Sequence, residues 1–415
     1  MPRFIYSFIL TIVMPFVPLK LLWRGFKQHE YRQHWAERVG FYNTIVQKPI
    51  IWLHCVSVGE TRAAEPLIKA LQVRYPQHQI LLTHGTPTGR DASEALFGDS
   101  IQRVYLPYDL PCAVNNFLTH FQPKIGLIME TELWFNLIAA CKQNQIPLLL
   151  LNARMSEKSF VGYQKLGKLT REGLQNLTAV AAQTITDATR LQHLGAQNIS
   201  VAGNLKFDVK PPADIANKGA QLRTLLGENR TLFLAASTRA GEEALILKAV
   251  EGLDVLTIIV PRHPQRFDEV EALIKKAGFT YLRRSNLRDP AHKNVQVILG
   301  DSMGELFSYY AACDFTFIGG SLMPFGGQNL IEAATMGKPI LIGEHTFNFA
   351  DATEKAINAG AAIRVKDVKE LRQQIQFLTE NKDQCKVLQQ AALSFSASAT
   401  GATKRLMLLI ESYLF

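Results

Sequence analysis

The chain has 415 residues, of which 47% are hydrophobic and 20% charged, and its formal net charge is +9 at neutral pH. This length exceeds what one hydrophobic core usually supports, so two domains are expected, while the ordinary composition excludes a disordered chain and a membrane protein with many spans. The positive charge suits an anionic partner, which could be nucleic acid, a phospholipid surface or a phosphorylated substrate.

The first predicted element is an apolar helix at the N-terminus. Residues 4–19 carry no charged side chain, and the apolar run continues past Lys20 to Trp23. A bilayer core of roughly 30 Å needs about 17 to 25 helical residues, and Pro15 and Pro18 would kink or end a helix. Both a short span and an anchor that lies in the interface are therefore compatible with residues 1–24, and we favour the span.

Two other interpretations of this segment compete with a membrane anchor. One is a buried helix of a soluble domain, and the other is a secretory signal peptide, although no small-residue cleavage site follows the apolar run. The basic residues at positions 20, 24, 27, 32 and 38 would hold the body of an anchored protein on the cytoplasmic side.

Beyond residue 48, short apolar runs alternate with longer segments of helical period. The runs begin at residues 50, 79, 103, 125, 147, 179 and 199, and then at 232, 256, 295, 315, 339 and 361. Because these runs are continuous rather than alternating, they predict parallel strands covered by helices on both faces. The fold class is therefore α/β, with two Rossmann-like, doubly wound domains facing across a cleft.

The predicted domain boundaries follow from a break in this rhythm. Paired prolines and polar residues at 206–219 predict a linker between an N-terminal domain, 25–205, and a C-terminal domain, 220–415. The last helix of the C-terminal domain is a candidate to pack back on the N-terminal domain.

Several common chemistries lack their motifs. The chain has no G-x-G-x-x-G, no G-x-x-x-x-G-K-[ST], no H-E-x-x-H and no G-x-S-x-G, which counts against dehydrogenases, P-loop NTPases, zincins and serine hydrolases. No two aspartates are separated by a single residue, so a metal-free reaction is favoured. The five cysteines form no C-x-x-C pair, which fits a reducing cytosol without a disulfide framework.

The strongest local signal is the glycine-rich stretch from Phe317 to Gly343. Its glycines would let backbone N–H groups approach a ligand, and a helix starting near Gln328 would present a positive dipole end to a phosphate. Asn329 and Glu332 would share one face of that helix, where a carboxylate can accept both hydroxyls of a ribose. The alternative is that the glycines make tight turns and Glu332 is a solvated acid.

Two neighbouring stretches would face the same crevice, because both follow predicted strands of the same domain. Arg262, His263 and Arg266 could donate to phosphate and base, and GDSMGEL at 300–306 supplies a turn and a helix start. Taken singly, Arg262 is as readily a salt-bridge partner, and His263 is more readily structural than catalytic.

One carboxylate, Glu60, follows the first predicted strand at a glycine. It is either a general base in a cleft or an acid that favours the dipole of the next helix. We expect Thr61 and Arg62 to open that helix, so that Pro66 lies in its first turn or else kinks it.

Seven motifs carry a resemblance to a known family. They are VSVGE at 56–60, METELWFN at 129–136, NARMSEKS at 152–159, GNLKFD at 203–208, PRHPQRF at 261–267, GDSMGEL at 300–306 and GGQNLIEAA at 326–334. Together they resemble the 3-deoxy-D-manno-octulosonic acid (Kdo) transferases, which build the inner core of lipopolysaccharide, over essentially the full length. The sequence departs from the family at Phe135, where a proline is expected, and at Gln328, where a histidine is also common.

What the resemblance implies is a GT-B type glycosyltransferase of the inner membrane with its catalytic body in the cytoplasm. It implies CMP-Kdo as the donor, held by the C-terminal domain, and a lipid A precursor, lipid IVA, as the acceptor, held by the N-terminal domain. An anionic membrane surface is a further expected partner, whereas no cofactor, metal or nucleic acid is expected. A membrane-tethered nucleotide-sugar-binding module without turnover remains the alternative.

The resemblance also implies the site residues. Glu60 would be the general base, and partial burial would raise its pKa toward the working pH. Glu130, with Glu132 as its competitor, and Lys206 would stabilise the transition state. The implied donor contacts are Pro261, Arg262, Met303, Gly304, Glu305, Gly326, Gly327, Asn329, Leu330, Ile331 and Glu332.

Overall fold

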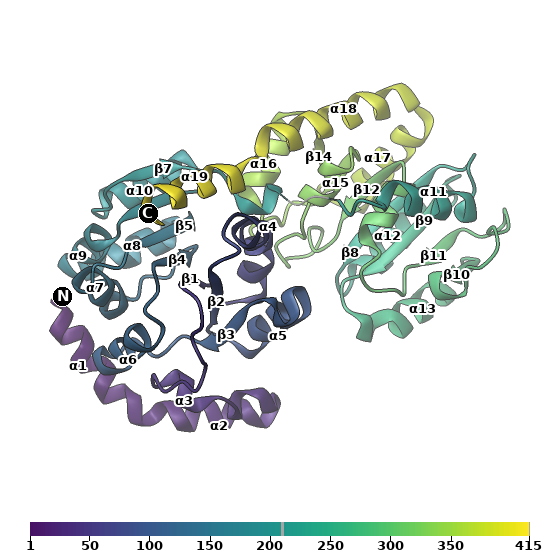
Figure 1. Cartoon of the computed structure of the whole chain (residues 1–415). Coiled ribbons are helices and arrows are strands. Elements are labelled where there is room, and N and C mark those ends of the chain that lie inside the picture. Colours follow the sequence, from purple (N-terminus) through teal and green to yellow (C-terminus); the bar gives the residue numbers. More distant parts are fainter. Residues whose placement is uncertain (209–210, 415) are drawn as a thin grey trace. The chain divides into compact units, whose positions relative to one another are not determined.

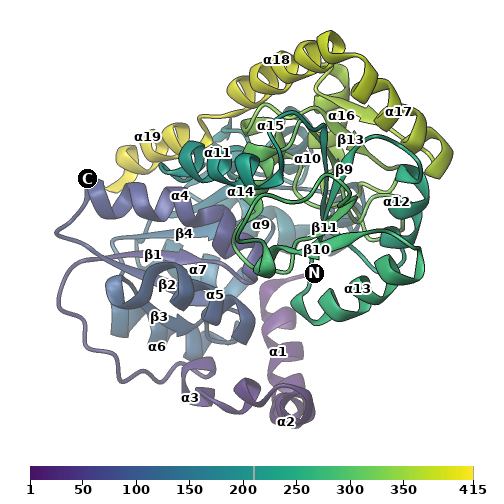
Figure 2. The same ribbon diagram turned by 90° about the vertical axis from the view of Figure 1, so that its right-hand side faces the viewer.

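The structure, a computed structural model, describes residues 1–208 and 211–414 and consists of two compact units. Unit 1 comprises Met1–Asp208 together with Thr400–Phe415, and unit 2 comprises Val209–Ala399. Each unit contains one parallel sheet of seven strands with helices on both faces (Figure 1) (Figure 2). The expected fold class, two doubly wound α/β units, is confirmed.

The strands of unit 1 are ordered β3-β2-β1-β4-β5-β6-β7. Their bounds are β1 (Ile50–His54), β2 (Gln79–His84), β3 (Gln102–Tyr105), β4 (Ile125–Met129), β5 (Leu148–Ala153), β6 (Ala179–Ala182) and β7 (Ile199–Val201). The chain winds outward from β1 to β3 and then returns to β4, so the winding direction reverses between β1 and β4. In open α/β sheets, ligands bind at the carboxyl ends of strands at such a reversal.

The helices of unit 1 connect these strands and cover both faces of the sheet. They are α1 (Arg3–Val13), α2 (Val17–Lys27), α3 (Trp35–Arg38), α4 (Val58–Arg74), α5 (Pro87–Phe97), α6 (Pro111–Phe121), α7 (Phe135–Gln143), α8 (Glu157–Leu166), α9 (Lys168–Asn176), α10 (Ile185–His193) and α19 (Ala402–Leu414), with short 3-10 turns η1 (Met14–Phe16), η2 (His29–Arg32), η3 (Gly98–Ser100) and η4 (Leu205–Asp208).

The continuous apolar strands of unit 1 are explained by two cores, one on each face of the sheet. Along β1, Ile50 and Trp52 pack into one core, whereas Ile51 and Leu53 pack into the other. Successive side chains of a strand point to opposite faces, so a strand covered on both sides must be apolar throughout. All the residues of β1 are buried as a result.

Unit 2 repeats this architecture with the strand order β10-β11-β9-β8-β12-β13-β14. Its strands are β8 (Leu232–Thr238), β9 (Leu256–Pro261), β10 (Tyr281–Arg283), β11 (Val297–Leu299), β12 (Phe315–Ile318), β13 (Ile340–Ile342) and β14 (Ala362–Arg364). Its helices are α11 (Ile215–Leu226), α12 (Glu242–Val250), α13 (Phe267–Lys276), α14 (Leu306–Ala312), α15 (Ile331–Thr335), α16 (Ala350–Asn358), α17 (Val368–Glu380) and α18 (Lys382–Ala399), with the turns η5 (Pro264–Arg266) and η6 (Arg284–Asn286).

Every predicted apolar run coincides with a strand, but the sequence analysis missed β10. This strand lies at the edge of its sheet and its three residues are only half-buried. Its segment Tyr281–Arg283 is short and ends in an arginine, so it does not form an apolar run in the sequence.

The segment predicted as a linker, 206–219, is only partly irregular. Residues 206–208 belong to η4 of unit 1, and α11 of unit 2 begins at Ile215. Residues 209 and 210 lie outside the described residues. The C-terminal helix α19 belongs to unit 1, where Leu406 and Ile410 join the same core as Leu53 of β1.

The N-terminal segment forms α1, η1 and α2. Residues Arg3–Phe26 are long and apolar enough to cross a membrane, with a mean hydropathy of 1.9, yet only 6% of the apolar stretch is buried. The interpretation of this segment as a buried helix of a soluble core is therefore wrong.

Candidate active site

Glu60 lies in the first turn of α4, directly after β1. The helix begins at Val58 rather than at Thr61, so Pro66 lies in the helix interior and not in its first turn. Ser57 caps the helix by accepting the N–H of Glu60, and the Glu60 carboxylate in turn accepts the Val56 N–H at 2.7 Å and the Ser57 hydroxyl at 2.9 Å. This reciprocal arrangement is a variant of the capping box.

The environment of Glu60 makes its carboxyl a weaker acid than that of an exposed glutamate. Its side chain is buried, with 9% of the residue exposed, and burial is the main cause that raises its pKa to about 7. The nearby carboxylates Glu130 and Glu132 raise the pKa further, whereas the hydrogen bonds from Val56 and Ser57 oppose the rise. A carboxylate with a pKa near neutrality can accept a proton during a reaction and release it afterwards.

Glu130 follows β4, the strand that pairs with β1 at the reversal point of the sheet. Its backbone is left-handed, with a φ of 58°, so Glu130 begins a turn after the strand ends at Met129, and Glu132 follows this turn. Burial, and then the charge of Glu130, raise the pKa of Glu132.

Lys206 lies in η4, and its Nζ is 4.0 Å from Oε1 of Glu130. Two asparagines hold this turn in place. Asn152 at the end of β5 accepts the Leu205 N–H at 3.0 Å, and Asn204 accepts the Lys206 N–H at 2.9 Å. The three expected catalytic residues therefore gather at the carboxyl edge of one sheet, within unit 1.

The sequence analysis missed the residues that position this group. Ser57 could have been found, because S-x-x-E before an apolar run is a capping signature. Asn152 and Asn204 lie within the recognised motifs, but nothing in their spacing indicates that they join β5 to η4.

In unit 2 the expected donor contacts follow three strands that end at one edge of the sheet. Pro261 ends β9, and Arg262 follows it with its backbone N–H bonded to Thr238 O at 3.0 Å. The guanidinium of Arg266 donates to Glu243 at 2.6 and 3.0 Å and to Glu269 at 2.9 Å, so it is paired within unit 2.

The turn after β11 contains Met303, Gly304 and Glu305. Met303 is 60% exposed, and Gly304 has a φ of 81°. The Glu305 carboxylate accepts hydrogen bonds from Arg284 at 3.0 Å and from the Ser302 hydroxyl. Met303 therefore presents its side chain to solvent, and Gly304 gives the turn its shape. Glu305 is already hydrogen-bonded to Arg284 and Ser302.

The glycine-rich loop after β12 differs from the expected anion site in two ways. The helix α15 begins at Ile331 instead of near Gln328, and its five residues supply only a small dipole. The N–H groups of Gly327 and Gln328 donate to carbonyls of the same loop at 2.7 and 3.0 Å. Asn329 lies before the helix, where it accepts the Ile331 N–H and donates to Glu332, each at 3.0 Å.

A buried acid that was not considered from the sequence accepts hydrogen bonds from three other amides of this loop. Glu242, at the start of α12, accepts the N–H groups of Gly320, Ser321 and Leu322 at 2.6, 3.0 and 3.0 Å, and that of Arg239 at 2.9 Å. Of the glycine amides that we had expected to approach a phosphate, that of Gly320 thus binds a carboxylate of the chain itself. Burial raises the pKa of this carboxyl, and the backbone hydrogen bonds oppose the rise.

Comparisons with known proteins identify the family. A family model described as 3-deoxy-D-manno-octulosonic-acid transferase matches residues 33–209. A 3-deoxy-D-manno-octulosonic acid transferase of Bordetella pertussis is 42% identical over 378 residues, covering 88% of this chain and 87% of the relative. The enzyme of the same name from Haemophilus influenzae is 37% identical over 422 residues, covering 99% of each chain. The chain belongs to the Kdo transferase family.

Membership of the Kdo transferase family confirms the resemblance seen in the seven motifs. The chain is a glycosyltransferase of lipopolysaccharide synthesis. Among solved structures, a glycosyltransferase from Rickettsia africae is 17% identical with a TM-score of 0.58, covering 90% of this chain and 98% of that one, a likeness that concerns the fold alone.

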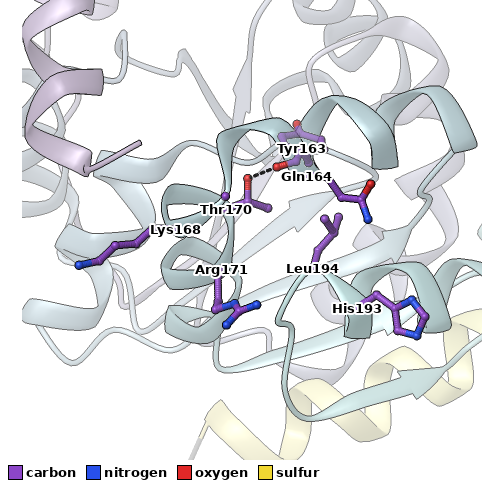
Figure 3. A pocket seen from close by; sticks show the side chains of 8 residues that line it. Tyr163, Gln164, Lys168, Thr170, Arg171, His193 and Leu194 are labelled. Atoms are coloured by element: carbon purple, nitrogen blue, oxygen red, sulfur yellow. Dashed lines mark hydrogen bonds between the residues drawn. The ribbon is translucent and has the colours of Figure 1, made fainter.

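A surface hollow of about 490 Å³ in unit 1 has none of the expected site residues of this Kdo transferase in its lining, although Tyr163 of the lining donates to the carbonyl of Thr131, next to Glu130, at 3.3 Å. Figure 3 shows its lining from α8, α9 and α10, with Thr170 donating to the Tyr163 carbonyl at 2.8 Å. Lys168, Arg171 and His193 extend in different directions and do not converge on one point (Figure 3). We assign this hollow no role in transfer.

The Glu242 contacts lead to a prediction about stability. Glu242→Gln should lower the free energy of unfolding of unit 2 by about 2 to 4 kcal/mol, because an amide NH₂ would face backbone N–H donors in a buried site. Urea unfolding of the whole chain measures this change, and Glu251→Gln, at the exposed end of the same helix, is the control. An unchanged midpoint would show that the loop holds its shape without the carboxylate.

Proposed function

We propose that this Kdo transferase moves Kdo from CMP-Kdo to a hydroxyl of a lipid A precursor, lipid IVA, by direct displacement with inversion at the anomeric carbon. The observation that carries the proposal is Glu60, a buried carboxyl with a pKa of about 7 at the reversal point of its sheet, beside the pair of Glu130 and Lys206. This is the combination of acid–base group and charged neighbours that such a displacement uses.

In the proposed reaction, one bond forms and one breaks. The acceptor hydroxyl oxygen attacks the anomeric carbon of Kdo while Glu60 accepts the hydroxyl proton, and the bond from that carbon to the phosphate oxygen of CMP breaks. CMP leaves with the bonding electron pair, so negative charge grows on its phosphate. The Lys206 ammonium stabilises this charge, and Glu130 holds the ammonium in place.

The proposed donor contacts all belong to unit 2. Arg262 follows β9, the residues around Gly304 follow β11 and the glycine-rich loop follows β12. Since the loop amides of Gly320 to Leu322 bind Glu242, we assign CMP recognition in this loop to side chains, chiefly Asn329 and Glu332, rather than to a helix dipole.

We propose that transfer requires no divalent metal and no other cofactor. The proposal follows from the sequence, which lacks closely spaced aspartates of the D-x-D type. Within residues 1–208 and 211–414, no group of three or more His, Cys, Asp or Glu side chains is placed to hold an ion.

We further propose that the protein is attached to the cytoplasmic side of the inner membrane through residues 1–24, because the acceptor is a lipid and the N-terminal helices are apolar and exposed. This attachment would hold unit 1 at the surface where its acceptor lies.

The product assay tests the proposed reaction. Purified full-length protein, CMP-Kdo and detergent-dispersed lipid IVA should yield lipid IVA that is heavier by one or more Kdo units, by mass spectrometry, at the same initial rate in excess EDTA as with added Mg²⁺. A protein that binds CMP-Kdo but forms no product would instead be a binding module without turnover. A rate that collapses in EDTA and recovers with Mg²⁺ would contradict the metal-free mechanism.

A further inference from the structure

The two faces of the N-terminal helices have opposite surroundings. The outward face is a stripe of large apolar side chains at spacings of three and four residues, each between 54% and 80% exposed: Phe4, Phe8, Ile12, Phe16, Leu19, Trp23 and Phe26. We call these residues the apolar stripe. Within α1 and within α2, residues three and four apart share one face of the helix, and exposed apolar faces of this kind mark an interaction surface.

The inward face of α1 is bound to unit 1 by polar contacts. The Tyr6 hydroxyl donates to Asp109 at 2.8 Å, and the Ser7 hydroxyl donates to Asn136 at 2.9 Å. Asp109 is only 3% exposed and also accepts the N–H groups of Asn136 and Leu137 at 2.9 and 2.8 Å. The Tyr6 ring packs edge-on against Phe135, with 5.4 Å between the centroids.

These contacts are incompatible with an α1 that crosses the bilayer. A spanning helix would carry Tyr6 and Ser7 into hydrocarbon, where their hydroxyls would lose Asp109 and Asn136 as partners. The helix is also interrupted at η1, and α1 and α2 run in different directions in both views (Figure 1) (Figure 2). The 11 residues of α1 extend only about 16 Å, roughly half of a bilayer core.

The charges around the apolar stripe fit the headgroups of anionic phospholipids. The first acidic residue of the chain is Glu30, whereas Lys20 and Arg24 are exposed on α2 next to the stripe. Arg32 lies over the ring of Phe26, 5.0 Å from its centroid. Cations that flank an apolar helix face are typical of helices that lie in a membrane interface.

We propose that α1 and α2 lie flat in the cytoplasmic interface of an anionic bilayer, with the apolar stripe inserted and with Tyr6 and Ser7 fastening α1 to unit 1. The protein is thus attached to one leaflet and does not cross the membrane, in contrast to the span that we favoured from the sequence. This inference rests on the proposed membrane attachment and is independent of the catalytic roles of Glu60 and Lys206.

Cross-linking in membranes tests the fastening of α1. The background is the full-length protein with Cys112→Ser, which removes the exposed cysteine. In this background, the pair Ser7→Cys and Asn136→Cys should form a disulfide on mild oxidation. The disulfide should form both in detergent and in vesicles that contain phosphatidylglycerol. The matched control, Phe8→Cys with Asn136→Cys, should not, because Phe8 points outward. A Ser7–Asn136 pair that cross-links in detergent but not in vesicles would overturn the proposal.

Depth measurement tests the same proposal without changing the buried Asn136. Nitroxide labels placed singly at residues 4, 8 and 12 should all lie about 5 to 10 Å below the headgroup boundary of such vesicles. A spanning helix would place residues 4 and 12 about 12 Å apart in depth, at 1.5 Å a residue, and that result would overturn the proposal. Failure of the labelled protein to float with vesicles would overturn it as well.

The product assay on the same labelled proteins separates the two proposals. Membrane attachment can fail while lipid IVA in detergent is still converted, which leaves the transferase function intact. Loss of product with correct cross-links and depths would instead count against the catalytic proposal alone.

Discussion

Glu60→Gln is expected to lower the rate of Kdo transfer by about 100-fold or more, because a general base contributes about 100- to 10,000-fold to such a step. The amide oxygen of glutamine can still accept the Val56 N–H, so the first turn of α4 should remain folded. The dissociation constant for CMP should stay near that of the wild type, since the proposed donor contacts belong to unit 2. Initial rates and titration calorimetry with CMP measure the two quantities.

The control for this variant is Glu65→Gln on the same helix, whose carboxylate is paired with Lys69 at the surface. It should keep nearly full activity. If Glu60→Gln loses less than tenfold, Glu60 serves mainly to cap α4, which is the role that its contacts with Val56 and Ser57 already give it.

The pH dependence of kcat/KM offers an independent check on the same residue. A base works in its deprotonated form, so activity should rise through about pH 7 as Glu60 loses its proton. Ser57→Ala removes a hydrogen bond that lowers the pKa of Glu60, and it should move this limb to higher pH. A lower limb near pH 4.5 that Ser57→Ala leaves unmoved would show that Glu60 is not the titrating group.

Lys206→Met is expected to lower kcat by about 100-fold, because it removes the cation proposed to stabilise the departing CMP, and one oriented donor of this type contributes about 100- to 1,000-fold. Lys206→Arg, which restores a positive charge, should recover part of the loss. Measurement of kcat with saturating CMP-Kdo and lipid IVA separates this effect from donor binding.

The matched control for Lys206 is Lys218→Met, which removes an exposed lysine that is paired with Asp214 in unit 2. It should leave kcat unchanged. Full activity of Lys206→Met would contradict the proposed role, and a large loss of thermal stability in that variant would point to a structural function of the contact with Glu130.

The fold was predictable because the central strands of both sheets are buried on both faces. Covering both sides of β1 requires apolar residues at every position, and this requirement is visible as an unbroken run in the sequence. The failure at β10 has a local cause, since the half-buried segment Tyr281–Arg283 ends in an arginine and leaves no apolar run to detect. Helix starts were less predictable, since α4 begins at Val58 instead of Thr61 and α15 begins at Ile331 instead of near Gln328.

The candidate site was predictable only where side chains follow strand ends. Glu60 and Glu130 follow neighbouring strands, so their proximity is a consequence of the sheet order. The hydrogen bonds from the glycine-loop amides to Glu242 were not predictable. Glu242 is 78 residues before Gly320, and in the sequence it resembles an ordinary acid in the first turn of its own helix. The inward contacts of Tyr6 and Ser7 were hidden for a similar reason, since Asp109 and Asn136 are distant in sequence.

The return of the chain to unit 1 affects the order in which the protein is completed on the ribosome. Asp208, the last residue before the chain enters unit 2, accepts the N–H groups of Gly401, Ala402 and Thr403, and Leu406 and Ile410 then fill the core beside Leu53. Unit 2 is therefore synthesised in full before the material for unit 1 is complete. The apolar helices α1 and α2 are made first, and the unit to which they belong is finished last. A fragment that ends at residue 208 therefore lacks part of the core of unit 1, and loss of α19 damages unit 1 rather than unit 2.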